Sequence, residues 1–222
     1  MLDIDVWMKD FKDKILSSFG NRVIFIGLQG SYARGEATTE SDIDVVVIFD
    51  CLSFNDLEKY DTIISSLPYR DKICGFVSGK DELTNWEKYD LFQFYYDTIP
   101  IYNNLDFLEH LIKKENIRQA VLIGACNIYH SCCHNTVHEK NFDILQALYK
   151  QSVFVLQAKH FYDTGNYIRQ RKELLNKLKL KDRAILSNYF AIKSNKIYNI
   201  TFKQYSNDLF KWSKELINKF HI

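Results

Sequence analysis

The chain has 222 residues, which is enough for one large domain or two small ones. Its 29 basic side chains nearly balance 28 acidic ones, which argues against a general nucleic-acid surface because such a surface has to be basic. No apolar run approaches a membrane span, the acidic start lacks a signal-peptide pattern, and five cysteines without a framework spacing are typical of a reducing compartment. We therefore expect a cytoplasmic protein that works without a membrane or a nucleic acid.

The first hundred residues predict the alternation of helices and strands that is typical of a small mixed α/β domain. An amphipathic stripe predicts a first helix over residues 3–18. Runs of β-branched and aromatic residues predict strands over residues 22–28, 41–49, 72–78 and 99–102, the last at a sheet edge because it contains Pro100. Further helices are expected over residues 53–67 and 80–89. Residues 92–96 are strongly aromatic, and their period does not decide between a helix and a strand.

A turn between the first two strands carries the chemistry. Gly30 lets the backbone approach a ligand closely, and Ser31 stands where a helix should begin, so that free backbone N–H groups there would attract phosphate. Asp42 and Asp44 are expected on one side of the next strand, near its start. Two carboxylates at this spacing repel each other, and a divalent cation relieves that repulsion. Hard oxygen ligands beside a phosphate-binding turn predict Mg²⁺.

Gly30-Ser31, a gap of ten residues (32–41) and Asp42-Ile43-Asp44 resemble the signature of the polymerase-β-type nucleotidyltransferase superfamily. The run from Ser41 to Asp44 is similar to that of the two-domain aminoglycoside adenylyltransferases in particular. The resemblance implies a catalytic domain over residues 1–110 and an acceptor-binding domain over residues 111–222. It covers the first hundred residues clearly and the rest more weakly.

The second half of the chain predicts a helical bundle. Amphipathic segments joined by short connections are expected over residues 117–138, 141–163, 174–180, 182–192 and 202–220. The predicted fold class is therefore an α/β nucleotidyltransferase domain with a mixed sheet, followed by an all-α helical bundle.

One helical face of this half carries His130, His134 and His138, at positions i, i+4 and i+8. Imidazoles at this spacing can chelate a transition metal, but Cys132 and Cys133 lie on other faces of a straight helix. The sequence leaves three interpretations open: a metal site, a polar stripe that lines a cleft, and packing. We expect protein purified without chelator to hold less than one zinc per chain.

The resemblance implies transfer of AMP from ATP, with Asp42 and Asp44 as the catalytic pair that holds Mg²⁺ and with Gly30, Ser31 and Arg34 at the nucleotide. A solvated Arg34 is an equally good interpretation. Family members carry a third carboxylate on the third strand, which here contains Cys74 and Gly75. Asp71 and Glu139 are the candidate bases for the acceptor hydroxyl.

Three functions stay open at this stage. The acceptor is a small molecule, such as an aminoglycoside-like antibiotic, or a protein, as for antitoxin-like members of the superfamily. Alternatively the chain is a nucleotide-binding regulator that has lost catalysis, because the third-strand acid is missing. A polycationic antibiotic would need an acidic cleft. Local acids that could form one are Asp90, Asp97, Glu109 and Glu139.

Overall fold

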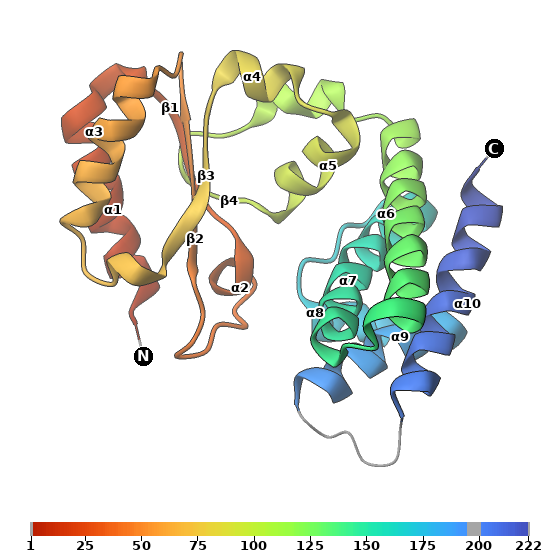
Figure 1. The fold of residues 1–222 in the computed structure, drawn as a ribbon. Coiled ribbons are helices and arrows are strands. Elements are labelled where there is room, and N and C mark those ends of the chain that lie inside the picture. The colour runs from red at the N-terminus through yellow and green to blue at the C-terminus, as the bar shows by residue number, and fades with distance from the viewer. Residues whose placement is uncertain (1, 195–200, 222) are drawn as a thin grey trace. The chain divides into compact units, whose positions relative to one another are not determined.

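The computed structural model describes residues 2–194 and 201–221. The chain divides into two compact units, Met1–Leu111 and Ile112–Ile222. The first unit contains a mixed sheet covered by helices, and the second is a bundle of helices (Figure 1). The predicted fold class is confirmed.

The sheet of the N-terminal unit has the strand order β3-β2-β1-β4. Its strands are β1 (Val23–Leu28), β2 (Ile43–Phe49), β3 (Ile73–Gly79) and β4 (Ile99–Tyr102). β1 is antiparallel to β2 and to β4, whereas β2 and β3 are parallel. β4 is the edge strand that Pro100 predicted. β2 begins two residues later than predicted, because the backbone N–H and the hydroxyl of Ser41 bind Thr38 in a turn.

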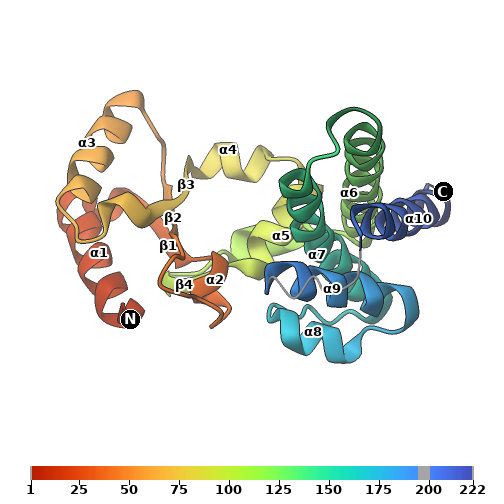
Figure 2. The ribbon, with the colours of Figure 1, turned by 60° about the horizontal axis from the view of Figure 1, so that its bottom comes forward.

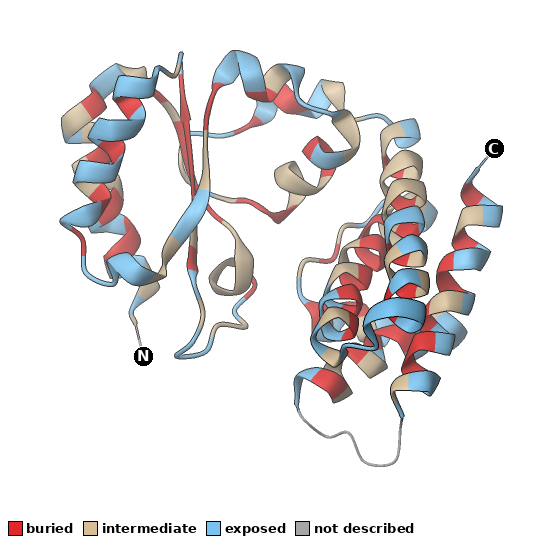
Figure 3. Cartoon of the chain, viewed as in Figure 1, coloured by how far each residue is buried: buried red, intermediate tan, exposed pale blue. Residues whose placement is uncertain are grey.

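Helices cover both faces of this sheet, α1 (Ile4–Phe19) and α3 (Phe54–Ser65) on one and α4 (Lys80–Asn85) and α5 (Lys88–Asp97) on the other (Figures 1 and 2). The predicted stripe of α1 buries Trp7, Phe11 and Ile15 against the sheet. A second core lies on the face of the sheet covered by α4 and α5, and the short 3-10 helix Asp106–Leu111 adds Leu108 to it. β1 and β2 are buried along nearly their whole length, because they lie in the middle of the sheet (Figure 3).

The segment after β3 differs from the prediction. The helix expected over residues 80–89 is two helices, separated at Trp86 and Glu87. The ring of Trp86 packs edge-on against Phe76 of β3, 5.5 Å between centroids, which anchors the break to the sheet. The aromatic run 92–96, left open by its period, lies in α5. Phe94 of this run also packs on Phe76, at 5.0 Å.

The C-terminal unit packs α6 (Lys114–His134) against α7 (Phe142–Thr164) and α10 (Phe202–Phe220), while α9 (Leu180–Lys193) packs on α7. The helix expected over 117–138 ends as an α-helix at His134 and continues as a π-helix, Asn135–Glu139. The helix expected over 174–180 lies earlier, as α8 (Arg171–Lys177). Leu178 then turns inward into the core.

The structure also bears on the predicted lack of a membrane span and on the cysteines. Over residues 2–194 and 201–221, none of the helices is both long enough and apolar enough to cross a bilayer. All five cysteines have free thiols.

Candidate active site

Strand alternation decides where the two predicted metal ligands lie. Ile43, Val45 and Val47 of β2 point into the core under α1 and α3. The residues between them belong to the opposite face, where Val46 and Ile48 pack in the second core. Asp44 lies on that face at the start of the strand and is half-buried, and Asp42, two residues earlier, is exposed.

The turn that ends β1 lies directly against Asp44. The backbone N–H of Gln29 donates to the backbone carbonyl of Asp44 over 2.8 Å, which fixes the turn to the start of β2. Gly30 has a φ of +68°, and a Cβ atom there would lie 1.7 Å from Asp44 Oδ2. Only glycine therefore allows this backbone conformation together with the close approach of the carboxylate. The Asp44 carboxylate beside this turn, with the Asp42 carboxylate two residues earlier in the chain, offers hard oxygen donors of the kind that fit Mg²⁺.

α2 (Gly30–Ala33) follows the turn, and Arg34 ends it. Arg34 is 8% exposed, and its Nε lies 3.4 Å from Glu36 Oε2. A solvated Arg34 is therefore wrong. The buried guanidinium holds the loop after the turn through Glu36, next to the place predicted for the phosphates.

Gln29 is a positioning residue that sequence reasoning missed. Its side-chain amide donates to Thr98 Oγ1 over 2.6 Å, and the Thr98 hydroxyl donates to the backbone carbonyl of Phe94 in α5. These bonds tie the turn before Gly30 to the end of α5 and the start of β4. No motif in the sequence links residues 29 and 98, so only the sheet pairing of β1 with β4 shows the connection.

The third strand carries no acid beside the predicted pair. The parallel register places Cys74 next to Asp44, and the Cys74 side chain is exposed. Gly75 permits this close pairing, because a Cβ atom there would lie 1.9 Å from the carbonyl oxygen of Val45. Asp71 lies outside the strand, in the 3-10 helix Arg70–Lys72, and Glu139 is an exposed residue of the other unit.

A partly exposed ion pair links the residue before β1 to α3. Arg22 binds both carboxylate oxygens of Asp56, with Nη1–Oδ1 at 2.6 Å and Nη2–Oδ2 at 3.0 Å. Hydrogen bonds from Arg22, and then from Ser53, hold the pKa of the Asp56 carboxyl far below its usual range. Ser53 and Asp56 also form the capping box that begins α3, so one carboxylate joins the residue just before β1 to that helix.

The histidine stripe lies in the C-terminal unit, and all three of its side chains are exposed. The packing interpretation is therefore wrong. The rings of His134 and His138 are 4.9 Å apart between centroids. Over the described part of the chain, no group of three His, Cys, Asp or Glu side chains is placed to hold a metal.

Of the local acids proposed for a cationic acceptor, Asp97 is buried, whereas Asp90, Glu109 and Glu139 are exposed. Burial, and then the charge of Glu87, raise the pKa of Asp90. These acids belong to different units, and the structure does not gather them into one cluster within either unit.

Comparison with known proteins agrees with this geometry. Residues 8–102 match the model of the nucleotidyltransferase domain family. A putative protein adenylyltransferase of Methanocaldococcus jannaschii is 46% identical over 54 residues, which are 24% of this chain and 51% of that protein. A second one from the same organism is 44% identical over 43 residues, 19% of this chain and 43% of that protein. The matched segments thus span about half the length of these relatives or less.

The N-terminal unit therefore contains a segment, residues 8–102, that matches the nucleotidyltransferase domain family, as its motif predicted. Over nearly its whole length the fold is that of the spectinomycin adenyltransferase AAD(9) from Enterococcus faecialis, solved with ATP and spectinomycin. The TM-score to that structure is 0.55 at 15% identity, covering 97% of this chain and 98% of the other.

Proposed function

We propose that the chain transfers AMP from ATP to a hydroxyl group of an acceptor and releases pyrophosphate. The observation that supports this most is the contact between the Asp44 carboxylate and the backbone of Gly30. It brings a predicted metal ligand and a predicted phosphate-binding turn into one small site. The names of the curated relatives and the ATP in the AAD(9) structure also favour adenylyl transfer.

In this proposal Asp42 and Asp44 hold Mg²⁺, which would neutralise charge on the triphosphate and align the attacked phosphorus. The N–H groups of Gly30 and Ser31 and the Ser31 hydroxyl bind the outer phosphates. Arg34 serves the nucleotide through its position beside the turn, where its charge adds to the attraction for phosphate.

The acceptor hydroxyl has to lose a proton as it attacks phosphorus, and a carboxylate near neutral pH can accept it. Asp71, just before β3, and Glu139 are the two candidates. Cys74 occupies the position beside Asp44 that would otherwise suit a carboxylate. The variants Asp71→Asn and Glu139→Gln distinguish the candidates, because loss of the base lowers turnover without lowering ATP affinity.

A small molecule is the acceptor that we favour, because the similarity to AAD(9), whose structure contains spectinomycin, covers 97% of this chain and so includes the helical unit. A protein acceptor is the second candidate, and it is favoured by the names of the curated relatives. Those matches cover 24% of this chain or less, which is too little to span both units.

The test is incubation of the purified chain with α-labelled ATP, Mg²⁺ and either spectinomycin, other hydroxyl-rich small molecules or a cell extract. We expect Mg²⁺-dependent pyrophosphate release with label on a small molecule. Label on a protein band would instead support the second candidate. Asp44→Asn serves as the inactive reference. Equal turnover in that variant would refute the assignment of the site.

A further inference from the structure

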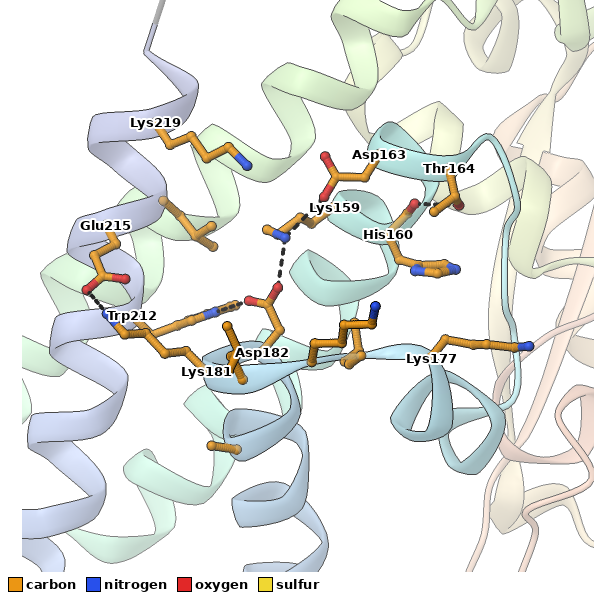
Figure 4. A pocket seen from close by; sticks show the side chains of 15 residues that line it. Lys159, His160, Asp163, Thr164, Lys177, Lys181, Asp182, Trp212, Glu215 and Lys219 are labelled. Atoms are coloured by element: carbon orange, nitrogen blue, oxygen red, sulfur yellow. Dashed lines mark hydrogen bonds and ion pairs between the residues drawn. The ribbon is translucent and has the colours of Figure 1, made fainter.

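The C-terminal unit contains an open pocket of about 900 Å³ that nucleotidyl transfer by the N-terminal unit does not explain. Its walls are the end of α7, the connection from α8 to α9, the first turn of α9 and the last turns of α10 (Figure 4). All of these elements belong to one compact unit. The volume is in the range of small-molecule sites, roughly 300–1,000 Å³.

Part of the charge in this pocket is already neutralised. Lys159 reaches between two carboxylates, with Nζ 2.7 Å from Asp182 Oδ2 and 3.1 Å from Asp163 Oδ2 (Figure 4). Lys181 pairs with Glu215. The three acids that line the pocket are thus all engaged by two of its lysines, so the acids do not attract a cationic ligand.

The remaining charge is positive. Lys177, Lys179 and Lys219 also line the pocket, and within residues 2–194 and 201–221 none of them has a carboxylate partner. Burial lowers the pKa of His160; the charge of Asp163 opposes this, and the charges of Lys159 and Lys177 add to it, so the net shift favours the neutral imidazole. Five lysines and three acids leave the lining with a net charge of +2.

The bottom of the pocket is apolar. Trp212, Leu178 and Leu216 line it and are 3–6% exposed, and Leu180, which is 90% exposed, offers apolar surface to a ligand. The indole Nε1 of Trp212 donates to Asp182 Oδ1 over 2.8 Å, so the same carboxylate that binds Lys159 also fixes the ring. In the view of Figure 4, Lys219 lies above Trp212, and Lys177 lies to the right with its ammonium group directed away from the indole. An apolar bottom with cations at its rim fits an amphipathic anion.

We propose that this pocket binds a small organic phosphate, a molecule with one phosphate group and an apolar or aromatic body. A phosphate monoester carries roughly −1.5 to −2 at pH 7, which matches the +2 of the lining. Lysine ammonium groups bind phosphate as point charges, and the apolar body packs against the exposed side chain of Leu180. The pocket does not suit a polycationic ligand. The inference does not depend on the proposed function.

Calorimetric titration of the full chain with phenyl phosphate, without Mg²⁺, tests the proposal. We expect one molecule bound per chain, and we expect the double variant Lys177→Gln/Lys179→Gln to weaken binding by about tenfold or more, because two charge-assisted contacts are lost. Lys172→Gln is the matched control: Lys172 is an exposed residue of the same helix, α8, that does not line the pocket. Its affinity should stay at the wild-type value. Both sets of lysines are exposed, so the variants should fold, and thermal unfolding checks this.

Three further titrations identify the recognised group and the site. Benzyl alcohol, which has the ring without the anion, should not bind. Benzoate binding as tightly as phenyl phosphate would overturn the phosphate assignment. Asp44→Asn, which abolishes transfer under the proposed function, should keep phenyl phosphate binding intact; loss of binding there would move the probe to the N-terminal unit and refute the proposal. Absence of saturable binding to the wild type, or equal weakening by Lys172→Gln, would also refute it.

Discussion

The two units build their candidate sites in opposite ways. In the N-terminal unit the site comes from residues 30–44, a short stretch that follows β1 and contains α2, a loop and the start of β2. In the C-terminal unit the pocket collects side chains from Lys159 to Lys219 across four segments. The first arrangement is determined by strand geometry, since alternation along β2 places Asp44 on the face opposite Ile43 and Val45. The second is determined by how helices pack, which no local spacing encodes.

This difference affects how each site tolerates change. The Gly30 turn has no space to spare, because the Asp44 carboxylate occupies the position of a side chain. The lysines of the pocket are exposed and long, so a substitution there removes charge with little effect on packing. Four experiments test this difference between the two units.

The largest effect is expected from Asp44→Asn. Loss of one ligand charge should lower Mg²⁺-dependent ATP turnover by about a thousandfold, because stabilisation of phosphoryl charge is the main catalytic term. Without Mg²⁺ the variant should be as stable as the wild type or more stable, since two like charges no longer repel. Asp5→Asn, an exposed change in α1, is the control for charge. Turnover is measured by pyrophosphate release. Wild-type turnover in Asp44→Asn would show that the N-terminal site tolerates substitution as readily as the C-terminal pocket.

Gly30→Ala and Gly35→Ala form the second experiment, because both glycines have positive φ, +68° and +67°. Each alanine costs about 1–2 kcal/mol of unfolding free energy for the left-handed conformation. Only at Gly30 does the new Cβ also meet Asp44, whereas nothing lies within 4 Å at Gly35. Gly30→Ala should therefore lose more stability and also lose ATP binding. Denaturant unfolding and calorimetry measure both quantities, and equal losses in the two variants would contradict a tight contact at Gly30.

The third experiment compares how the stability of the N-terminal unit and that of the C-terminal unit respond to acid. The pKa of Asp56 is lowered, so its contribution to stability is complete above the unfolded pKa, about 3.9, and is lost as pH falls further. Asp56→Asn should remove this dependence between pH 4 and pH 2 and lower stability at pH 7, because Arg22 loses its partner. Fluorescence of Trp7 in a Trp86→Phe/Trp212→Phe variant would follow the unit. An unchanged acid transition would show that the pair does not stabilise it.

The smallest effect is expected from His160 in the C-terminal unit. Its pKa is lowered by burial, so the folded state resists protonation, and stability should decrease as pH falls below the unfolded value of about 6.5. His160→Gln should flatten this decrease between pH 6.5 and pH 5. Trp212 is the only tryptophan of residues 112–222 and reports on this unit when Trp7 and Trp86 are replaced by Phe. A pH profile identical to that of the parent would exclude the histidine as its source.

Much of the N-terminal fold could be predicted from the sequence, because the hydrophobic period and the helix-capping residues there agree with the observed burial. Pro100 marked the edge strand, and Ser53 marked the start of α3. The aromatic run 92–96 could not be assigned, since aromatic residues suit a buried helix and a strand equally. The sequence did not predict the burial of Arg34. Its partner Glu36 is only two residues away, and a pair at this spacing follows neither the helix nor the turn patterns.

The C-terminal pocket could not be predicted. In the sequence, Lys177, Lys179 and Trp212 look like ordinary residues of amphipathic helices. They line one pocket because α8 ends at Lys177 and the chain turns inward at Leu178. The histidine stripe shows the reverse case, since a regular spacing led to a candidate site that the structure leaves exposed. Spacing predicts a site well when a strand or a tight turn enforces it, and poorly on a helix surface.

The most direct test of the central claim is a structure of the chain with Mg²⁺ and a non-hydrolysable ATP analogue. The account predicts Mg²⁺ between the carboxylates of Asp42 and Asp44, the outer phosphates on the N–H groups of Gly30 and Ser31, and an unchanged φ at Gly30. The acid nearest the α-phosphate would then decide between Asp71 and Glu139 as the base. A triphosphate bound away from Gly30, or a cation held without Asp44, would contradict the account.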